Sequence, residues 1–192
     1  MLSRERLLRA LAAAPAEVAL GARQAAIAVI LLEREVGLEV LLIERAIREG
    51  DPWSGHMALP GGHREPEDAD LAVTAERETR EEVGLDLHRN GERLGRLSDC
   101  EPVRAVPIAV RPFVYLLSAR PEFALGAEVT HALWVPIAPL IAGERQTTFN
   151  LARSGQNFKF PAWDIDGRVV WGLTHRVLSE LFARLNAVPG PP

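Results

Sequence analysis

The stretch LPGGHREPEDADLAVTAERETREEVGL, residues 59–85, decides the fold of this chain. It opens with a Pro-Gly-Gly turn and continues into a segment with the spacing of a helix. Asp68 or Asp70 is suited to cap the start of this helix, because a short acidic side chain accepts hydrogen bonds from the first free N–H groups. Gly84 is suited to end it, because glycine readily adopts the left-handed conformation of a helix C-terminus. The stretch therefore predicts a turn followed by one capped helix.

Three glutamates share one face of that predicted helix. Glu78, Glu81 and Glu82 are spaced i, i+3 and i+4, which places them within one turn of each other. Exposed like charges at this spacing repel by only about 0.2–0.5 kcal/mol per pair, so a solvated acidic face by itself explains the pattern. Three converging carboxylates would also form the oxygen-rich site that Mg²⁺ or Mn²⁺ prefers. Gly61 and Gly62 allow the backbone to approach the helix and a ligand closely. This context favours a metal site that faces a pyrophosphate.

Apolar runs on both sides of the stretch predict strands, and short polar or glycine-containing segments predict the turns between them. The expected strands are 25–32, 38–45, 106–117 with an interruption at Pro112, 131–137, and two short strands joined by a turn at Asp166-Gly167.

Helices are expected at both ends of the chain. An amphipathic helix is predicted over about residues 1–20, and a C-terminal helix over about residues 172–186. Strands and helices are mixed without strict alternation. We therefore expect an α+β fold, an α/β/α sandwich with a mixed sheet, in one domain over residues 1–192.

Composition and charge restrict the partners. The chain has 192 residues, of which 47% are hydrophobic, and a formal net charge of −4, so no general basic field attracts nucleic acid or a membrane surface. Lys159 is the single lysine, so an individual arginine is weak evidence for phosphate binding in this arginine-biased chain. Cys100 is the single cysteine, which suits a reducing compartment, and no apolar run is long enough to span a bilayer. We expect a cytoplasmic protein; the sequence leaves the oligomeric state open and is compatible with a homodimer.

Residues 62–85 resemble the Nudix box, G-x5-E-x7-R-E-U-x-E-E-x-G-U, where U is apolar. Two departures are present: Asp68 replaces the first glutamate, and eight residues rather than seven separate it from Arg77. The same aspartate and extra residue resemble the coenzyme A pyrophosphatase branch of the family, as do the flanking segments LLIERA and VVWGLTHRVLSELF. The loop REGDPWSGHMA differs from that branch. The residues at family positions are Gly62, Arg77, Glu78, Glu81, Glu82, Gly84 and Leu85.

The resemblance implies a Nudix fold and a hydrolase that cleaves the pyrophosphate of a nucleoside diphosphate linked to another group. It implies that Glu78, Glu81 and Glu82 hold Mg²⁺ or Mn²⁺, and that Arg77 orients a box glutamate. The acceptor of the water proton varies within the family. Glu81, Glu82 and an acid outside the box, for which Glu128 is the candidate, all remain open.

The resemblance also suggests substrate contacts. Gly61 and Gly62 would let phosphates approach, and Arg45 and Arg48 would reach them, while Trp53 would stack on a base or anchor its loop. The partner is a small nucleotide, most simply coenzyme A or a derivative. The alternatives are ADP-ribose, dinucleotides or oxidised nucleotides as substrates, and a module that binds a nucleotide without hydrolysing it.

Overall fold

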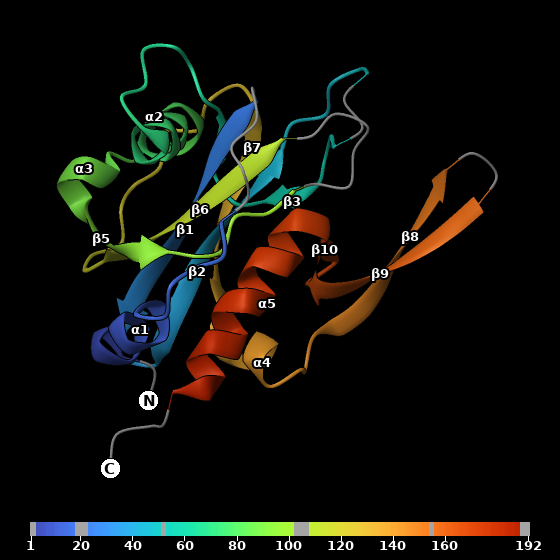
Figure 1. Cartoon of the computed structure of the whole chain (residues 1–192). Helices are drawn as coiled ribbons and strands as arrows, with labels where there is room; N and C mark the ends of the chain where they lie inside the picture. Colours follow the sequence, from blue (N-terminus) through green and yellow to red (C-terminus); the bar gives the residue numbers. More distant parts are fainter. Residues whose placement is uncertain (1–2, 18–22, 51–52, 102–107, 154–155, 189–192) are drawn as a thin grey trace.

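A mixed β-sheet separates two helical layers (Figure 1). The computed structural model describes residues 3–17, 23–50, 53–101, 108–153 and 156–188. Helices α2 (Leu71–Val83) and α3 (Leu87–Asn90) lie on one side of the sheet, and α1 (Arg4–Leu11) and α5 (Gly172–Ala187) on the other. The predicted α/β/α sandwich is therefore confirmed.

The strand order along the sheet is β3-β2-β1-β6-β5, with β4 paired to β1 and β7 paired to β2. Strands β1 and β6 are parallel and the other pairs are antiparallel. Because helices cover both faces, β1 is buried along most of its length, which explains its unbroken apolar run. The strands are β1 (Gln24–Arg34), β2 (Gly37–Arg45), β3 (Met57–Ala58), β4 (Gly61–His63), β5 (Gly91–Arg96), β6 (Ala109–Leu117) and β7 (Val129–Pro136).

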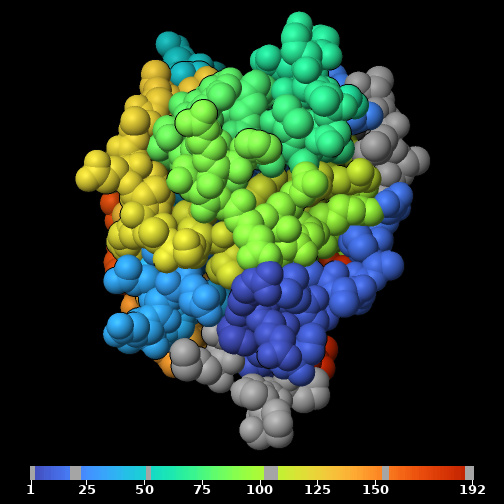
Figure 2. Space-filling model, turned by 90° about the vertical axis from the view of Figure 1, so that its left-hand side faces the viewer, coloured from blue at the N-terminus to red at the C-terminus, as the bar shows by residue number. Residues whose placement is uncertain are grey.

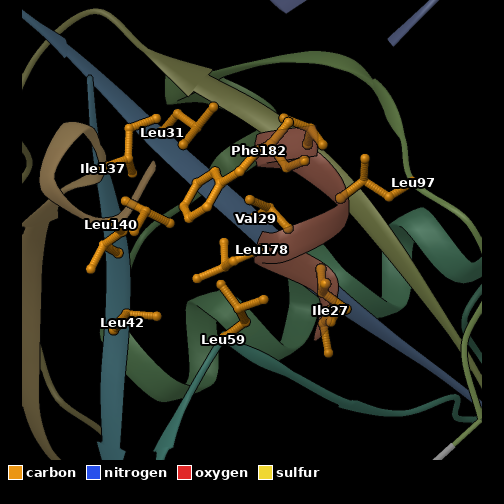
Figure 3. Packing of buried hydrophobic residues seen from close by; sticks show 14 of the residues in the cluster. Ile27, Val29, Leu31, Leu42, Leu59, Leu97, Ile137, Leu140, Leu178 and Phe182 are labelled. Carbon is orange, nitrogen blue, oxygen red and sulfur yellow. The ribbon is translucent and has the colours of Figure 1, made fainter. Parts of the chain in front are cut away.

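Two hydrophobic cores lie on the two faces of the sheet, because successive side chains of a strand point to opposite faces. On the α5 side, Val29 and Leu31 of β1 pack against Leu178 and Phe182 of the helix (Figure 3). On the α2 side, Ile30 belongs to the second core with residues of α2. The helix that carries the glutamates is thus held on a rigid sheet.

A second, three-stranded sheet precedes α5. It consists of β8 (Gln146–Arg153), β9 (Gln156–Ile165) and β10 (Arg168–Trp171), and it follows the short helix α4 (Ile137–Ile141). The β8–β9 hairpin extends away from the body of the molecule (Figure 1). The predicted turn at Asp166-Gly167 is confirmed, with Asp166 at a φ of 50°. Of the two predicted short strands, the second is confirmed, because β10 has 4 residues; the first is wrong, because β9 has 10 residues and pairs with a strand, β8, that was not expected.

Two other sequence predictions need correction. The N-terminal helix ends at Leu11 rather than near residue 20, because the chain approaches Pro15 and the residue before a proline is disfavoured in the helical conformation. Residues 1–2 and 18–20 lie outside the described part. Strand β6 runs through Pro112 without interruption, and the Pro112 carbonyl accepts a hydrogen bond from Leu97 N (3.0 Å). Residues 106–107 of the expected strand are also outside the described part. Within the described ranges, every helix is too short or too polar to cross a membrane.

Candidate active site

The Pro-Gly-Gly turn leads into β4, which lies against the end of β1. Gly61 pairs with Ile27 and has a φ of +144°, and a Cβ at this position would lie 2.2 Å from the Ala26 carbonyl oxygen. A Cβ on Gly62 would lie 2.4 Å from Glu78 Oε1. Gly61 is therefore required by its positive φ and its close approach to the backbone of the neighbouring strand, whereas a side chain at Gly62 would displace the Glu78 carboxylate of α2.

Helix α2 begins and ends where the sequence predicts. The Asp70 side chain accepts hydrogen bonds from Ala72 N (2.8 Å) and Val73 N (3.0 Å), and so caps the helix. Gly84 closes it with a φ of 72°. Of the two proposed caps, Asp70 takes this role and Asp68 takes another, described below. The caps determine where α2 starts and stops.

Glu82 is buried against the glycine turn. Its side chain is 5% exposed, and its Oε2 accepts a hydrogen bond from Gly61 N at 3.0 Å. Burial raises the pKa of Glu82 to about 8, although the Gly61 N–H and the charge of Arg45 oppose this shift. Burial also raises the pKa of Glu78, against the opposing effect of Arg77. Two desolvated carboxylates that repel one another are thus concentrated at the turn.

Arg77 connects this pair to the loop before the helix. Its Nε and Nη2 each donate to one carboxylate oxygen of Asp68 at 3.1 Å, and Nη1 donates to Glu78 Oε1 at 3.1 Å and Glu81 Oε2 at 3.2 Å. Asp68 is 5% exposed and also accepts from Thr74 Oγ1 (2.9 Å). These hydrogen bonds, those from Arg77 above all, lower the pKa of Asp68 to about 2. Sequence reasoning paired Arg77 with a box glutamate and missed the bidentate pair with Asp68.

The other two predicted acids, Glu81 and Glu128, are more exposed than Glu78 and Glu82. The Glu81 side chain is 56% exposed and turned toward Arg77. Glu128 is 54% exposed and pairs with Arg48 Nη1 at 3.1 Å. The charge of Glu128 raises the pKa of both Glu78 and Glu82, so it faces the same region.

The donor set fits a hard divalent cation. Glu78 and Glu82 supply carboxylate oxygens, and burial is the main cause of their raised pKa values; a bound cation would stabilise these desolvated carboxylates in their charged form. As the side chains stand, no three acidic, histidine or cysteine residues among those described converge closely enough to enclose an ion. Glu81 would have to turn from Arg77 to join the other two.

Trp53 packs within an aromatic cluster rather than standing free. Its ring centroid lies 5.9 Å from that of His56 and 5.8 Å from that of Trp171, and Phe149 stacks on Trp171 at 4.0 Å. This favours the loop-anchor interpretation of Trp53. Sequence reasoning did not include Phe149 and Phe160 of the hairpin; the signal was their alternation with polar neighbours along two strands.

Several known proteins are similar to this chain in sequence or in structure. The family model described as "NUDIX domain" matches residues 22–154. The uncharacterized protein C14C4.10c of Schizosaccharomyces pombe is 40% identical over 121 residues, which cover 60% of this chain and 37% of that protein. The mitochondrial coenzyme A diphosphatase NUDT8 of Mus musculus is 33% identical over 141 residues, which cover 71% of this chain and 64% of that protein. The matches thus span less than two thirds of either relative's length.

A solved structure shares the fold. The crystal structure of a MutT/nudix family protein from Enterococcus faecalis aligns with a TM-score of 0.57, covering 96% of this chain and 70% of that chain at 17% sequence identity.

Proposed function

Since this chain belongs to the Nudix hydrolase family, we propose that it is a metal-dependent hydrolase of a nucleoside diphosphate linked to another group, with coenzyme A or a derivative as its substrate. The observation that carries the proposal is the pair formed by the buried Glu82 and the partly buried Glu78, placed by α2 against the Gly61-Gly62 turn. A solvated acidic face would not bury Glu82 or connect it to a glycine N–H.

The metal ligands in this proposal are Glu78, Glu82 and, after rotation from Arg77, Glu81. A Mg²⁺ or Mn²⁺ ion bound there would shield the charge of the pyrophosphate and acidify a water molecule. Arg77 is the positioning residue, because it holds Glu78 and Glu81 from one side and Asp68 from the other. Gly61 and Gly62 leave room for the phosphates.

The reaction adds water to one phosphorus and breaks its bond to the bridging oxygen. With coenzyme A the two products are adenosine 3′,5′-bisphosphate and 4′-phosphopantetheine, and the proton of the water passes first to a carboxylate. Glu81, Glu82 and Glu128 are the candidates for that acceptor. Arg45 and Arg48 lie near these carboxylates: the charge of Arg45 lowers the pKa of Glu82, and Arg48 forms an ion pair with Glu128.

The assignment of coenzyme A rests on two observations. The mouse relative is named a coenzyme A diphosphatase, and the aspartate at position 68 with the extra residue before Arg77 resembles that branch. The loop that contains Trp53 departs from the branch, and its tryptophan packs against His56 and Trp171. ADP-ribose, dinucleotides and oxidised nucleotides are therefore the substrates to compare.

A substrate panel tests the proposal. Purified protein is assayed with coenzyme A, acetyl-coenzyme A, ADP-ribose, NADH and an oxidised nucleoside triphosphate, each with Mg²⁺, with Mn²⁺ and with chelator. The highest kcat/KM is expected for a coenzyme A substrate, with turnover only in the presence of metal. A higher kcat/KM for another substrate would reassign the linked group. Tight nucleotide binding without turnover on any substrate would instead support a binding module.

A further inference from the structure

A cavity of about 500 Å³ opens on the α2 side of the molecule. Residues of β1, β5 and β6 form one wall, and the loop before α2 and the start of the helix form the other. Figure 2 views this side, where the green atoms of α2 and its preceding loop lie above the yellow-green atoms of the β5 region. No residue proposed for the catalytic centre lines the cavity. Along α2, Leu71 at its edge is about 10 Å from Glu78 at 1.5 Å per residue.

The cavity concentrates positive charge in an acidic protein. Four of its lining residues are arginines, whereas Asp70 is the single acidic residue among them. Nearly all basic residues of this chain are arginines, so finding an arginine rather than a lysine here does not indicate phosphate binding. The informative observation is that four arginines line one cavity. The formal net charge of the whole chain is −4, so this is a local reversal of sign. The arginines are Arg64, Arg93, Arg96 and Arg111.

Nearby acids compensate two of these four charges. Asp99 accepts from Arg111 Nε (2.8 Å) and Nη2 (2.7 Å), and its Oδ1 lies 3.6 Å from Arg96 Nη1. Arg96 also pairs with Glu17. The Asp70 carboxylate is already used, because it caps α2.

The other two arginines, Arg64 and Arg93, are not compensated by an ion pair among the described residues; Arg93 lies beside the Tyr115 hydroxyl, which donates to Glu76 Oε1 at 3.0 Å. Arg64 donates to neutral oxygens, namely Gln24 Oε1 (3.0 Å) and the carbonyls of Asp68 (3.1 Å) and Ala69 (3.3 Å). Within the described ranges, neither Arg64 nor Arg93 forms an ion pair with an acidic side chain. The Nη1 atom of Arg96 is buried and, among the described residues, has the Asp99 carboxylate at 3.6 Å but no acceptor within hydrogen-bond distance. A buried donor without an acceptor is costly, and a bound oxyanion, or a water molecule held with it, would provide one.

We propose that this cavity binds a small organic phosphate at a site separate from the catalytic centre. Guanidinium groups bind phosphate through paired hydrogen bonds, and Arg64 and Arg93 approach from opposite walls. Phe113, Leu71 and Ala72 add apolar surface for the organic portion. The volume lies within the range of about 300–1,000 Å³ that is typical of small-molecule sites.

Calorimetric titration with adenosine 5′-monophosphate in the presence of chelator tests the proposal. Without divalent metal, the catalytic carboxylates repel a phosphate, so binding under these conditions reports the arginine cavity. Adenosine is the matched probe without a phosphate. We expect adenosine monophosphate to bind and adenosine to bind at least about tenfold more weakly, because charge-assisted hydrogen bonds to the phosphate are lost.

Variants locate the site. The double variant Arg64→Gln, Arg93→Gln is expected to weaken binding by at least about tenfold. Both residues are exposed, so the variant is expected to fold, which its thermal unfolding checks. Arg89→Gln removes an exposed arginine outside the cavity and is expected to leave the affinity unchanged.

Three results would overturn the proposal. They are the absence of binding to the wild-type protein in chelator, equal binding by the double variant, and loss of binding in Glu78→Gln. Because the titration measures metal-free binding and not turnover, its outcome is independent of whether the chain hydrolyses coenzyme A.

Discussion

Arg77 is the residue that organises the candidate site. One planar guanidinium holds Asp68 in the loop before α2 and Glu78 and Glu81 on the helix, and it donates to the His63 carbonyl at 2.9 Å. An arginine can do this because its donors point in several fixed directions in one plane. The orientation of the proposed metal ligands thus depends on a residue that is not itself a ligand.

Arg77→Lys should therefore impair the metal site while preserving the charge. A lysine cannot bond Asp68 in a bidentate manner and reach the glutamates simultaneously, so we expect about a 10- to 100-fold loss of kcat/KM. The Mg²⁺ concentration for half-maximal activity should rise as well, a change that a general loss of stability would not produce. Arg80→Lys, at an exposed position of the same helix, is the control. Unchanged metal dependence in Arg77→Lys would refute the positioning role.

Because of Asp68, the free energy of unfolding is expected to fall at acid pH. Its pKa is lowered to about 2 in the folded protein, below the value of about 3.9 for an unperturbed aspartate. The stabilisation is therefore fully present above about pH 4 and is lost as the pH falls toward 2. At pH 7, Asp68→Asn should lower the free energy of unfolding by about 3 kcal/mol, because it breaks a buried ion pair.

Urea denaturation of both proteins between pH 3 and pH 7 measures this difference. The difference in the free energy of unfolding between wild type and Asp68→Asn is expected to be constant at the upper end of the pH range and to become smaller below about pH 4. If this difference instead became larger as the pH falls, folding would not favour the ionised form of Asp68.

At the level of elements, the site is the contact between β4 and α2. The two glycines of β4 serve different contacts: Gly61 has a positive φ and touches the β1 backbone, whereas Gly62 touches the Glu78 carboxylate. Gly62→Ala should displace Glu78 and reduce kcat/KM by at least about tenfold, with a small effect on thermal stability.

Gly61→Ala serves as the contrasting variant. It places a Cβ against the Ala26 carbonyl and should lower stability by more than about 1 kcal/mol. Thermal unfolding and kinetics of both variants measure the two effects. Full activity in Gly62→Ala would mean that the close approach to Glu78 has no catalytic importance.

Sequence reasoning predicted the elements whose causes are local. The caps Asp70 and Gly84 and the apolar runs of β1 and β2 are encoded within a few residues, and the structure reproduces them. The β8–β9 hairpin was missed although Phe149 and Phe160 alternate with polar neighbours, because these partly buried rings contact Trp171 of β10, and neither strand alone shows that contact. For the same reason, the spacing of the three glutamates did not show that Glu82 is buried while Glu81 is exposed.

At the scale of the whole molecule, the sandwich brings the carboxylates of Glu78 and Glu82 together at the Gly61-Gly62 turn. A metal that binds only the folded chain would stabilise it, by about 2.7 kcal/mol at about 100 times the dissociation constant. We expect Mn²⁺ to raise the unfolding temperature of the wild-type protein and to have a much smaller effect on Glu82→Gln. An equal increase in both proteins would place the metal elsewhere.

The most direct test of the central claim is the metal-dependent hydrolysis of coenzyme A by wild type, Glu78→Gln, Glu81→Gln and Glu82→Gln, with Glu67→Gln as an exposed control. Product release is followed chromatographically as adenosine 3′,5′-bisphosphate. The account predicts turnover by wild type and Glu67→Gln with Mg²⁺ or Mn²⁺, and at least about a 100-fold loss of kcat in each of the other three variants. Wild-type turnover by Glu82→Gln would contradict it.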